Sequence, residues 1–394
     1  MRTRVIECID EIPAADWNRV AGMANPFLRH EFLAALEHHD CVGARYGWVP
    51  QHITLHDEHN TLIGAAPLYL KDNSYGEFVF DWSWADAWHR AGKRYYPKLV
   101  SAIPYTPVTG PRLLVAPDAD NSAAHTALIE QALSLVETTG SSTLHWLFTD
   151  AADTNTLFEH KLLRRTSCHF HWHNPGYRSF DDFLSRLTSR KRKKIKRERR
   201  YVTDAGIRME MIYGDEATDE QWHIMYEFYR STFERKSGIP TLSLQFFREI
   251  SQTMGRQVIL VFAWHAGKAV AGAINLCGDH ALYGRHWGCR EQFHSLHFET
   301  CYYQGIDYCI RNGLRLFEPG AQGEHKISRG FLPSLTWSAH WIADPEFRAA
   351  VEKFLLNEHE LVLDYRDELQ RYSPFRKDID QQAGEYLKSV DGGG

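Results

Sequence analysis

The feature of this 394-residue sequence that most restricts its fold is an order of predicted elements that occurs twice. Apolar periodicity and turn residues predict, in each half, two helices, a meander of three strands, a further long helix and a buried strand. In the first half these elements are predicted at 14–20, 26–38, 51–56, 62–71, 75–80, 123–139 and 143–149, with a further aromatic helix over 82–103. In the second half they are predicted at 219–236, 243–254, 257–264, 268–278, 280–288, 294–312 and 314–318, before a strand at 335–342 and a closing helix at 346–370. No residue-level repeat accompanies this order, so the duplication is one of architecture.

Chain length and one linker signal divide the sequence into two domains. A chain of this length exceeds what a single ordinary core supports. The strongest linker signal is Asn174-Pro175-Gly176. We therefore predict an N-terminal domain over 1–173 and a C-terminal domain over 174–394. Each is predicted to be a mixed α/β sheet with helices on both faces.

Composition and charge restrict the cellular setting and the partners. The net charge of −5 gives no general attraction to nucleic acid or to an anionic membrane, so any such partner must be held by a local patch. The seven cysteines form no C-x-x-C pair, and their odd number argues against a complete disulfide framework, which fits a reducing compartment. The N-terminus lacks the apolar core of a signal peptide, and no apolar run approaches the ~20 residues of a membrane span. We expect a cytoplasmic protein without integral membrane association, and the sequence leaves its oligomeric state open.

Three stretches resemble a known family. The first, LTSRKRKKIKRERRYVTDAGI at 187–207, resembles the S-x-x-x-R-x-x-I-R-x-A-x-x-x-G pattern that opens the second domain of Fem-type peptidoglycan aminoacyltransferases. The second combines 283–289 with 298–317, which ends in YYQGIDYCIRNGLRLF. The third, EPGAQGEHKISRGF at 318–331, is similar to the family segment in which a strand runs into a Gly-containing turn, a Lys and a Gly-Phe pair.

Together these stretches look like the Fem-like predicted N-acyltransferases known as peptidoglycan biosynthesis/recognition proteins. The resemblance implies two fused domains of the acyl-CoA N-acyltransferase (GNAT) fold and transfer of an acyl or aminoacyl group to an amine. It does not identify the donor. Segment 288–300, GCREQFHSLHFET, departs from the R/Q-x-x-G-x-G/A pattern with which many GNAT enzymes hold the CoA pyrophosphate. We therefore expect no tightly bound cofactor and keep both acyl-CoA and aminoacyl-tRNA as candidate co-substrates.

Ionisable residues crowd at the end of the strand predicted at 314–318. Glycines and a proline there predict an irregular turn, and an irregular turn after a buried strand is a common place for an active site. An acceptor amine with a pKa near ~10 must lose a proton before it attacks, and Glu318 or His325 would accept it. Lys326 would help backbone N–H groups hold the carbonyl oxygen, and the resemblance places a substrate-side Lys at this position. A tyrosine on the following helix, Tyr302 or Tyr303, would protonate the leaving group. The competing interpretation of 318–329 is a surface loop with ordinary salt bridges.

Further residues are predicted to bind substrate. On the strand at 280–288, alternation places Arg285 and Trp287 on one face and His286 on the other. His286 would contact substrate or be a hydrogen-bonded core histidine. Glu299 would be a positioning group or form a structural ion pair, and we favour the ion pair. The predicted substrate-binding set is Arg285, His286, Trp287, Glu324, Arg329 and Tyr302.

A dense basic run at 186–200 predicts a site for an anionic donor. Like charges at helical spacing repel one another, so phosphates of tRNA, CoA or a nucleotide-linked precursor would suit this segment. The competing interpretation is a solvated charged face. The residues predicted to bind the donor are Arg190, Arg192, Lys193 and Lys196.

Two further groups of residues invite functional interpretations. His169, His171 and His173 would share one face of a strand, but no metalloprotease-type motif is present, so no metal is predicted and the role of these histidines is left open. Aromatic residues of the first half would fill the interface between the domains or line an acceptor groove with Asp81 and Asp86. These aromatic residues are Trp82, Trp84, Trp88, Tyr95 and Tyr96.

These observations favour an N-acyltransferase whose acceptor is a peptidoglycan precursor, an amino acid or a peptide. The alternative is a non-catalytic GNAT-fold module that binds cell-wall fragments or another anionic ligand. A third hypothesis is an RNA-binding protein that acts through 186–200.

Overall fold

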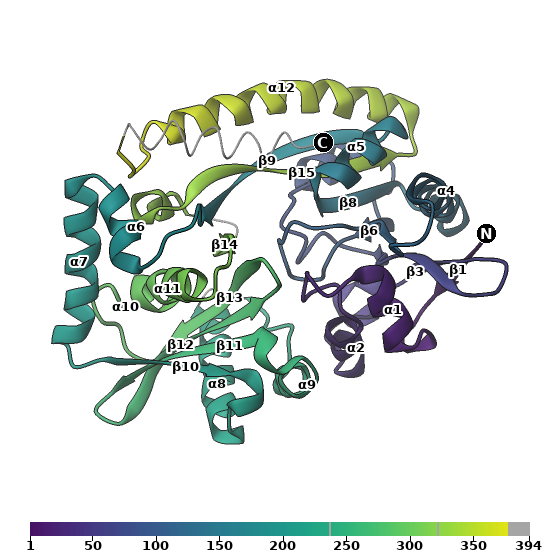
Figure 1. Cartoon of the computed structure of the whole chain (residues 1–394). Coiled ribbons are helices and arrows are strands. Elements are labelled where there is room, and N and C mark those ends of the chain that lie inside the picture. Colours follow the sequence, from purple (N-terminus) through teal and green to yellow (C-terminus); the bar gives the residue numbers. More distant parts are fainter. Residues whose placement is uncertain (236–237, 321–322, 377–394) are drawn as a thin grey trace.

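The computed structural model describes residues 1–235, 238–320 and 323–376. Within this part of the chain, the two halves lie side by side, and long strands run between them beneath a closing helix (Figure 1). The elements of the first half are β1 (Arg2–Ile6), α1 (Ala14–Ala21), α2 (His30–His38), β2 (Val49–Pro50), β3 (His52–His56), β4 (Leu62–Ala66), β5 (Tyr69–Lys71), α3 (Trp82–Arg90), β6 (Lys98–Ser101), β7 (Leu114–Val115), α4 (Asn121–Thr139), β8 (Thr143–Thr149), α5 (Ala151–Glu159) and β9 (Leu163–His173).

The second half shares with the first two helices, a group of strands and a further helix before a buried strand, but it has additional helices at its start and end. Its elements are α6 (Phe180–Arg186), α7 (Ser189–Asp204), β10 (Arg208–Tyr213), α8 (Asp219–Arg235), α9 (Leu244–Met254), β11 (Val258–His265), β12 (Lys268–Cys277), β13 (Ala281–Cys289), α10 (Leu296–Phe298), the π-helix η5 (Glu299–Tyr303), α11 (Gln304–Arg311), β14 (Leu316–Glu318), the 3-10 helix η6 (Glu324–Arg329), β15 (Leu332–Ile342) and α12 (Pro345–Gln370).

One large mixed sheet joins the two halves. Among the described residues, its strand order is β10-β11-β12-β13-β14-β9-β15-β8-β6-β5-β2, and a smaller sheet has the order β1-β3-β4-β7. The last long strand of each half lies beside the other half: β9 pairs with β14, and β15 pairs with β8. β9 and β15 also pair with each other at the centre of the sheet. Each half therefore completes its sheet with a strand from the other, and the domain boundary at 173/174 stays a prediction.

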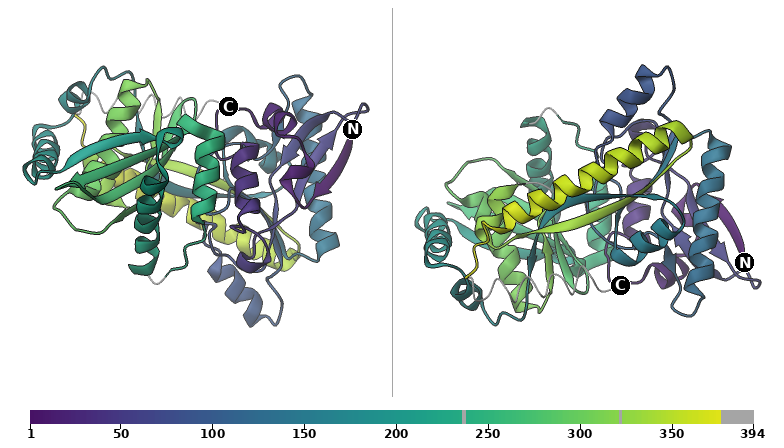
Figure 2. Two further views of the ribbon diagram at one scale, coloured as in Figure 1. Left: turned by 90° about the horizontal axis from the view of Figure 1, so that it is seen from below. Right: turned by 90° about the horizontal axis from the view of Figure 1, so that it is seen from above.

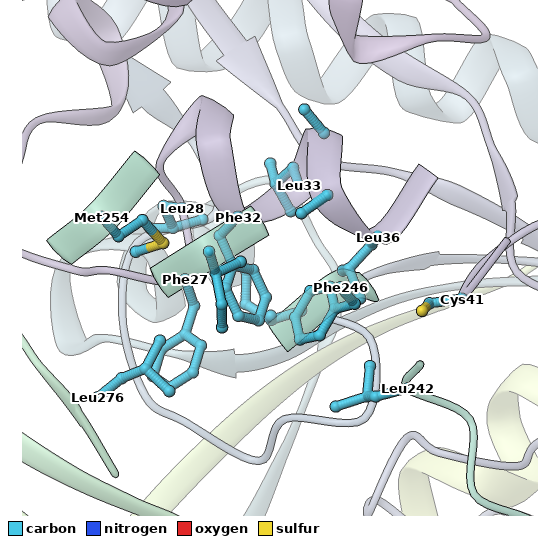
Figure 3. Close-up of a cluster of buried hydrophobic side chains, with 14 of the residues drawn as sticks. Phe27, Leu28, Phe32, Leu33, Leu36, Cys41, Leu242, Phe246, Met254 and Leu276 are labelled. Carbon is cyan, nitrogen blue, oxygen red and sulfur yellow. The ribbon is translucent and has the colours of Figure 1, made fainter. Parts of the chain in front are cut away.

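The two halves also share an apolar core. Ser243 caps α9, because its side chain accepts a hydrogen bond from the N–H of Phe246, and the apolar face of α9 then packs on α2. The rings of Phe32 and Phe246 meet edge to face at 5.5 Å (Figure 3). The ring of Phe27 meets that of Tyr283 of β13 at 5.2 Å. Each fully buried Phe contributes about 1.5–3 kcal/mol, so this cluster holds the halves together.

The structure corrects two expectations for the first half. Residues 75–80 form no strand, and the predicted helix 82–103 ends at Arg90 and is followed by β6. The alternation at 75–80 has a different cause. Glu77 of this segment and Asp81 just after it turn inward to the buried Lys98 of β6, so a polar contact rather than an apolar face sets the pattern. Trp84 and Trp88 contact His340 and Phe347 of the second half, as an interface role predicts, whereas Trp82 is exposed. No helix in the described ranges is long and apolar enough to cross a bilayer.

Candidate active site

The candidate site begins where two parallel strands separate. β13 and β14 pair from Ala281–Leu316 to Tyr283–Glu318. Beyond that pair β13 continues to Cys289, whereas the other chain turns away at Pro319 and Gly320. The φ of Gly320 is 94°, a value that L side chains rarely adopt, so glycine permits the turn. The separation leaves the end of β14 facing the middle of β13.

A β-bulge reshapes β13 at this point. Ile274 of β12 pairs with His286 and the next residue, Asn275, pairs with Gly284, so Arg285 is an extra residue in β13. The bulge breaks the alternation that predicts opposite faces for Arg285 and His286, and that prediction is wrong. Both side chains border one apolar crevice with Phe27, Phe32, Phe246 and neighbouring residues, whereas Trp287 borders a separate pocket.

Glu318 lies at the centre of the separation and is 4% exposed. It borders a narrow crevice, which we call the Glu318 crevice, and its Oε2 is 3.9 Å from Nε2 of His171. Burial raises the pKa of Glu318 to about 8, although Arg112, Arg285 and a hydrogen bond from the backbone of Thr109 oppose the shift. A carboxyl group with this pKa can exchange a proton near neutral pH. The crevice is lined by Pro107, Val108, His169, His171, Gly284, Arg285, Glu318 and Gly320.

The first half supplies one wall of the Glu318 crevice. Arg285 donates hydrogen bonds through Nη2 to the carbonyl oxygen of Tyr105 and, at 3.2 Å, to Oγ1 of Thr106. Pro107 and Val108 follow in the same loop and line the crevice. These residues were not among those predicted to form the site. The signal for them in the sequence is a run of turn-forming residues, Pro104, Pro107, Gly110 and Pro111.

Lys326 lies on the other side of the Gly320 turn and is buried, with 2% of its surface exposed. Its Nζ donates a hydrogen bond of 2.5 Å to the carbonyl oxygen of Gly320. Burial lowers the pKa of Lys326 to about 8, although the nearby Cys301 opposes this. Glu318 and Lys326 are therefore both buried titratable groups beside one turn.

His325 and Tyr302 form a pair next to this turn. Nε2 of His325 is 2.9 Å from Oη of Tyr302, and the two rings pack among His297 and Phe298. Burial, Arg329 and Lys326 lower the pKa of His325, which favours the neutral imidazole. Glu324 instead faces α12, where it accepts a 2.8 Å hydrogen bond from Tyr365.

Tyr303 and Arg329 meet around Glu198 of α7. Arg329 binds both carboxylate oxygens of Glu198, at 2.8 and 3.2 Å, and Tyr303 donates a hydrogen bond to the same carboxylate. Burial, followed by the charge of Glu198, raises the pKa of Tyr303, so its hydroxyl is a weak acid. In this arrangement Tyr303 and Arg329 hold α7 against η5 and η6.

The basic helix α7 has an anchored side and an open side. Arg199 binds Glu299 with N–O distances of 3.0–3.2 Å, which confirms the structural ion pair expected for Glu299. Lys196 lies 3.2 Å from Asp181, and Arg192 lies 3.5 Å from Oγ of Ser189. The exposed basic residues of α7 are Arg190, Lys193, Lys196, Arg197 and Arg200.

A pocket of about 260 Å³ lies between the end of β13 and the start of α10. The ring of Trp287 meets that of His297 edge to face at 5.1 Å, and Tyr201 of α7 meets His294 of the adjoining loop at 4.7 Å. The basic helix α7 therefore lies beside the segment that lines this pocket. The pocket, which we call the Trp287 pocket, is lined by Arg235, Trp287, Cys289, Glu291, Gln292, Phe293, Leu296 and His297.

The histidines of β9 do share one face, as the strand periodicity predicts. The ring centroids are 6.5 Å apart for His169 and His171 and 6.3 Å apart for His171 and His173. Burial lowers the pKa of all three, so they are neutral near pH 7. Within the described ranges, no group of three or more His, Cys, Asp or Glu side chains is arranged to hold a metal ion.

Comparisons with solved structures reveal the same fold. FemX aligns over 89% of this chain and 100% of its own, with a TM-score of 0.54 and 12% identity. The C-terminal domain of a putative lysylphosphatidylglycerol synthetase from Agrobacterium fabrum aligns over 87% and 97%, with a TM-score of 0.53 and 7% identity. A tandem GNAT protein from the clavulanic acid biosynthesis pathway covers 87% and 99%, with a TM-score of 0.45 and 13% identity.

The mixed α/β fold class predicted from the sequence is confirmed. A search of curated proteins gives no match. The FemAB-like family model, described as peptidoglycan biosynthesis/recognition, matches residues 8–377. With nearly the whole chain matched, this protein belongs to the FemAB-like family.

Proposed function

We propose that this protein transfers an acyl or aminoacyl group from an activated carrier to an amine at the Glu318 crevice. The observation that carries the proposal is Glu318, a buried carboxyl group with its pKa raised to about 8 at the point where β13 and β14 separate. FemAB-like family membership and the GNAT-fold neighbours support a transferase.

The proposed reaction uses groups that already lie around the turn. Ionised Glu318 accepts a proton from the acceptor ammonium, and the amine nitrogen then forms a bond to the carbonyl carbon. The oxyanion that develops is stabilised by protonated Lys326 and by backbone N–H groups at the β13 bulge. The bond to the carrier oxygen or sulfur then breaks as Tyr302, whose hydroxyl lies beside His325, donates a proton to the leaving group. The nitrogen of the new amide loses its extra proton, which restores the hydroxyl of Tyr302.

The donor that best fits this proposal is an aminoacyl-tRNA. In the Trp287 pocket, Trp287, Phe293 and His297 offer faces on which a base can stack, an interaction worth about 1–3 kcal/mol per base. The open basic side of α7 suits phosphates. A CoA pyrophosphate would find fewer hydrogen-bond donors here. The N–H groups of Leu296 and Phe298 already donate hydrogen bonds to the carbonyl oxygens of Phe293 and Ser295. The proposed acceptor is the amine of a peptidoglycan precursor, an amino acid or a peptide.

Transfer from labelled aminoacyl-tRNA to a panel of such amines tests the proposal. Glu318→Gln removes the base, so we expect the rate to fall by about 10²–10⁴ and the inflection near pH 8 to disappear. Glu352→Gln on the exposed side of α12 is the matched control and should leave the rate unchanged. Full activity of Glu318→Gln would show that the base assignment is wrong.

The donor assignment has its own test. Replacing Arg190 and Lys193 by Ser should weaken tRNA binding and flatten its dependence on salt, because two phosphate contacts are lost. Lys353→Ser on α12 removes an exposed cation far along the chain and should change neither property. Equal tRNA affinity of the double variant and the wild type would exclude α7 as the donor surface.

A non-catalytic module that binds cell-wall fragments is the second candidate. The observation in its favour is that the Glu318 crevice is too narrow in this structure to hold a water molecule, so an amine enters only if it widens. Saturable binding of muropeptides without transfer from either aminoacyl-tRNA or acyl-CoA would favour this candidate.

A further inference from the structure

In segment 75–82 the acidic side chains are buried and most of the large aromatic side chains are exposed, which reverses the usual arrangement. Glu77 and Asp81 are buried, at 3% and 2% exposed. The aromatic side chains between and around them point outward, although large apolar side chains normally avoid water. These four residues, which we call the aromatic ridge, are Tyr75, Phe78, Phe80 and Trp82, with exposed fractions of 70%, 40%, 54% and 43%.

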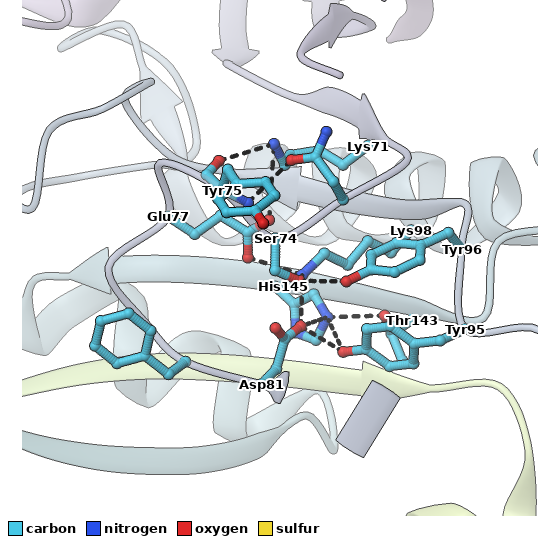
Figure 4. A network of polar contacts seen from close by, with 12 residues as sticks. Lys71, Ser74, Tyr75, Glu77, Asp81, Tyr95, Tyr96, Lys98, Thr143 and His145 are labelled. Carbon is cyan, nitrogen blue, oxygen red and sulfur yellow. Dashed lines mark hydrogen bonds and ion pairs between the residues drawn. The ribbon is translucent and has the colours of Figure 1, made fainter. Parts of the chain in front are cut away.

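Buried ion pairs hold the ridge in place (Figure 4). Nζ of Lys98 lies 2.8 Å from Glu77 and 2.5 Å from Asp81, and it also donates a 2.7 Å hydrogen bond to Ser74. Tyr95 donates a hydrogen bond of 2.5 Å to Asp81. Glu77, Val79 and Asp81 are buried, so Phe78 and Phe80, which alternate with them, are turned toward solvent.

The backbone of the ridge is also fixed. Phe78 has a φ of 61°, a left-handed conformation that is strained for a bulky residue. A Cβ at Gly76 would lie 2.6 Å from the ring of Tyr105, so only glycine fits there. The carbonyl oxygen of Tyr75 accepts hydrogen bonds from Lys71 and Trp48, each at 3.2 Å. A strained and well-anchored segment with exposed rings indicates a selected surface rather than a loosely packed loop.

Basic residues follow the ridge along the chain. The ridge leads into α3, the blue helix that projects from the edge of the molecule in both views of Figure 2. The end of α3 and the turn after it carry four exposed cationic or titratable side chains, and Asp86, which pairs with Arg90, is the acidic residue of the helix that faces solvent. These basic residues are His89, Arg90, Lys93 and Arg94.

We propose that the aromatic ridge docks this protein on the surface of an anionic lipid bilayer. Tyr and Trp prefer the headgroup region, Phe enters the acyl boundary, and each nearby Lys or Arg adds attraction to anionic lipid. The chain carries a net charge of −5, so only a local surface of this kind can bring it to such a bilayer. A projecting helix with rings at one end and cations at the other suits a broad, deformable interface. The docking does not depend on the proposed transfer reaction.

Co-sedimentation with vesicles of phosphatidylglycerol and phosphatidylethanolamine tests the proposal. Wild-type protein should bind these vesicles, and its affinity should fall at high salt and on phosphatidylcholine vesicles. The double variant Phe80→Ser, Trp82→Ser should lower the partition coefficient about tenfold or more, because two inserted rings are lost. Arg90→Ser with Arg94→Ser should remove most of the salt dependence.

The matched control is Phe158→Ser on α5, which removes another ring that is 55% exposed. It should bind vesicles like the wild type, and thermal unfolding should show that all variants keep the fold. Failure of the wild type to bind anionic vesicles would overturn the proposal. So would equal loss of binding in Phe158→Ser, or a vesicle-free dimer of the wild type that the ridge variant abolishes, because the ridge would then be an interface between two copies of the chain.

Discussion

The parallel pairs β6–β8 and β13–β14 occupy the same place in the two halves but have different contents. In the first half the pairing ends at Ser101–Trp146, and in the second half it ends at Tyr283–Glu318. A buried tryptophan thus stands where the second half has a carboxyl group. The residue after the pair is Ala102 on the chain of β6 and Gly284 on the chain of β13.

This difference separates a supporting half from a half that holds a site. After β6 the chain leaves the sheet as a loop, and the residues of that loop wall the Glu318 crevice of the other half. In the first half Lys98 binds Glu77 and Asp81, whereas in the second half Glu318 ends β14 and Lys326 lies beside the turn that follows it. The same topology therefore holds a buried ion-pair cluster in one half and the candidate site in the other.

Cutting the chain between the halves should have the largest effect of the changes that we predict, because both halves should lose their folded structure. A fragment of residues 174–394 lacks β9, the neighbour of β14, and a fragment of 1–173 lacks β15, the neighbour of β8. Each fragment exposes unpaired strand edges, so we expect each to be unfolded or aggregated alone. Circular dichroism and NMR of the separate and co-expressed fragments measure this. A well-folded 174–394 fragment would contradict the importance of strand exchange.

Removing Lys98 should cost more than removing Lys326. Lys98→Met leaves Glu77 and Asp81 buried without their cation, which should lower the free energy of unfolding by about 3–5 kcal/mol. Lys326→Met removes a cation that burial already disfavours and one hydrogen bond to Gly320, so its cost should stay near about 1 kcal/mol. Urea unfolding at neutral pH measures both. Equal costs would mean that the two buried lysines play the same role.

Glu318→Gln should stabilise the protein in a pH-dependent way. The pKa of Glu318 rises from an ordinary 4.5 to about 8 in the folded state, so the unfolded chain loses this proton first and the folded state becomes less stable as the pH rises between these values. The variant has no carboxyl group to titrate, so its free energy of unfolding does not fall in this way. In the wild type the fall amounts to about 1.4 kcal/mol per pH unit at most. Its advantage should therefore grow from about pH 4.5 and level off above about pH 8.

Thermal unfolding of the wild type and Glu318→Gln across this range measures that effect. The control Glu352→Gln changes an exposed carboxylate and should show no such trend. A constant difference between wild type and Glu318→Gln at all pH values would contradict the raised pKa.

The sequence predicted those parts of the molecule whose patterns arise locally. The apolar periodicity of α4, α9 and β8, and the glycines after β14, were enough to predict the duplicated order and the region of Glu318 and Lys326. The sequence did not predict the strand β6, because its first residue is a buried lysine, which no apolar pattern identifies. The wall formed by the loop after β6 and the bulge at Arg285 depend on pairing between distant strands, so periodicity along one segment cannot reveal them.

Exchanging the residues after the two parallel pairs should give the smallest effect. A Cβ at Gly284 would lie 3.3 Å from Cα of Pro319, so Gly284→Ala narrows the gap between the separating strands and should cost at most about 1 kcal/mol in stability. If the amine enters here, the same change should lower transfer about tenfold, since the added methyl group displaces the reacting atoms. The reciprocal variant Ala102→Gly should also cost about 1 kcal/mol, from lost burial and greater freedom of the unfolded chain, but should leave transfer intact. Chemical denaturation and initial rates measured on both variants distinguish the two halves: transfer that is equally sensitive to Ala102→Gly and Gly284→Ala would mean that the first half takes part in the reaction.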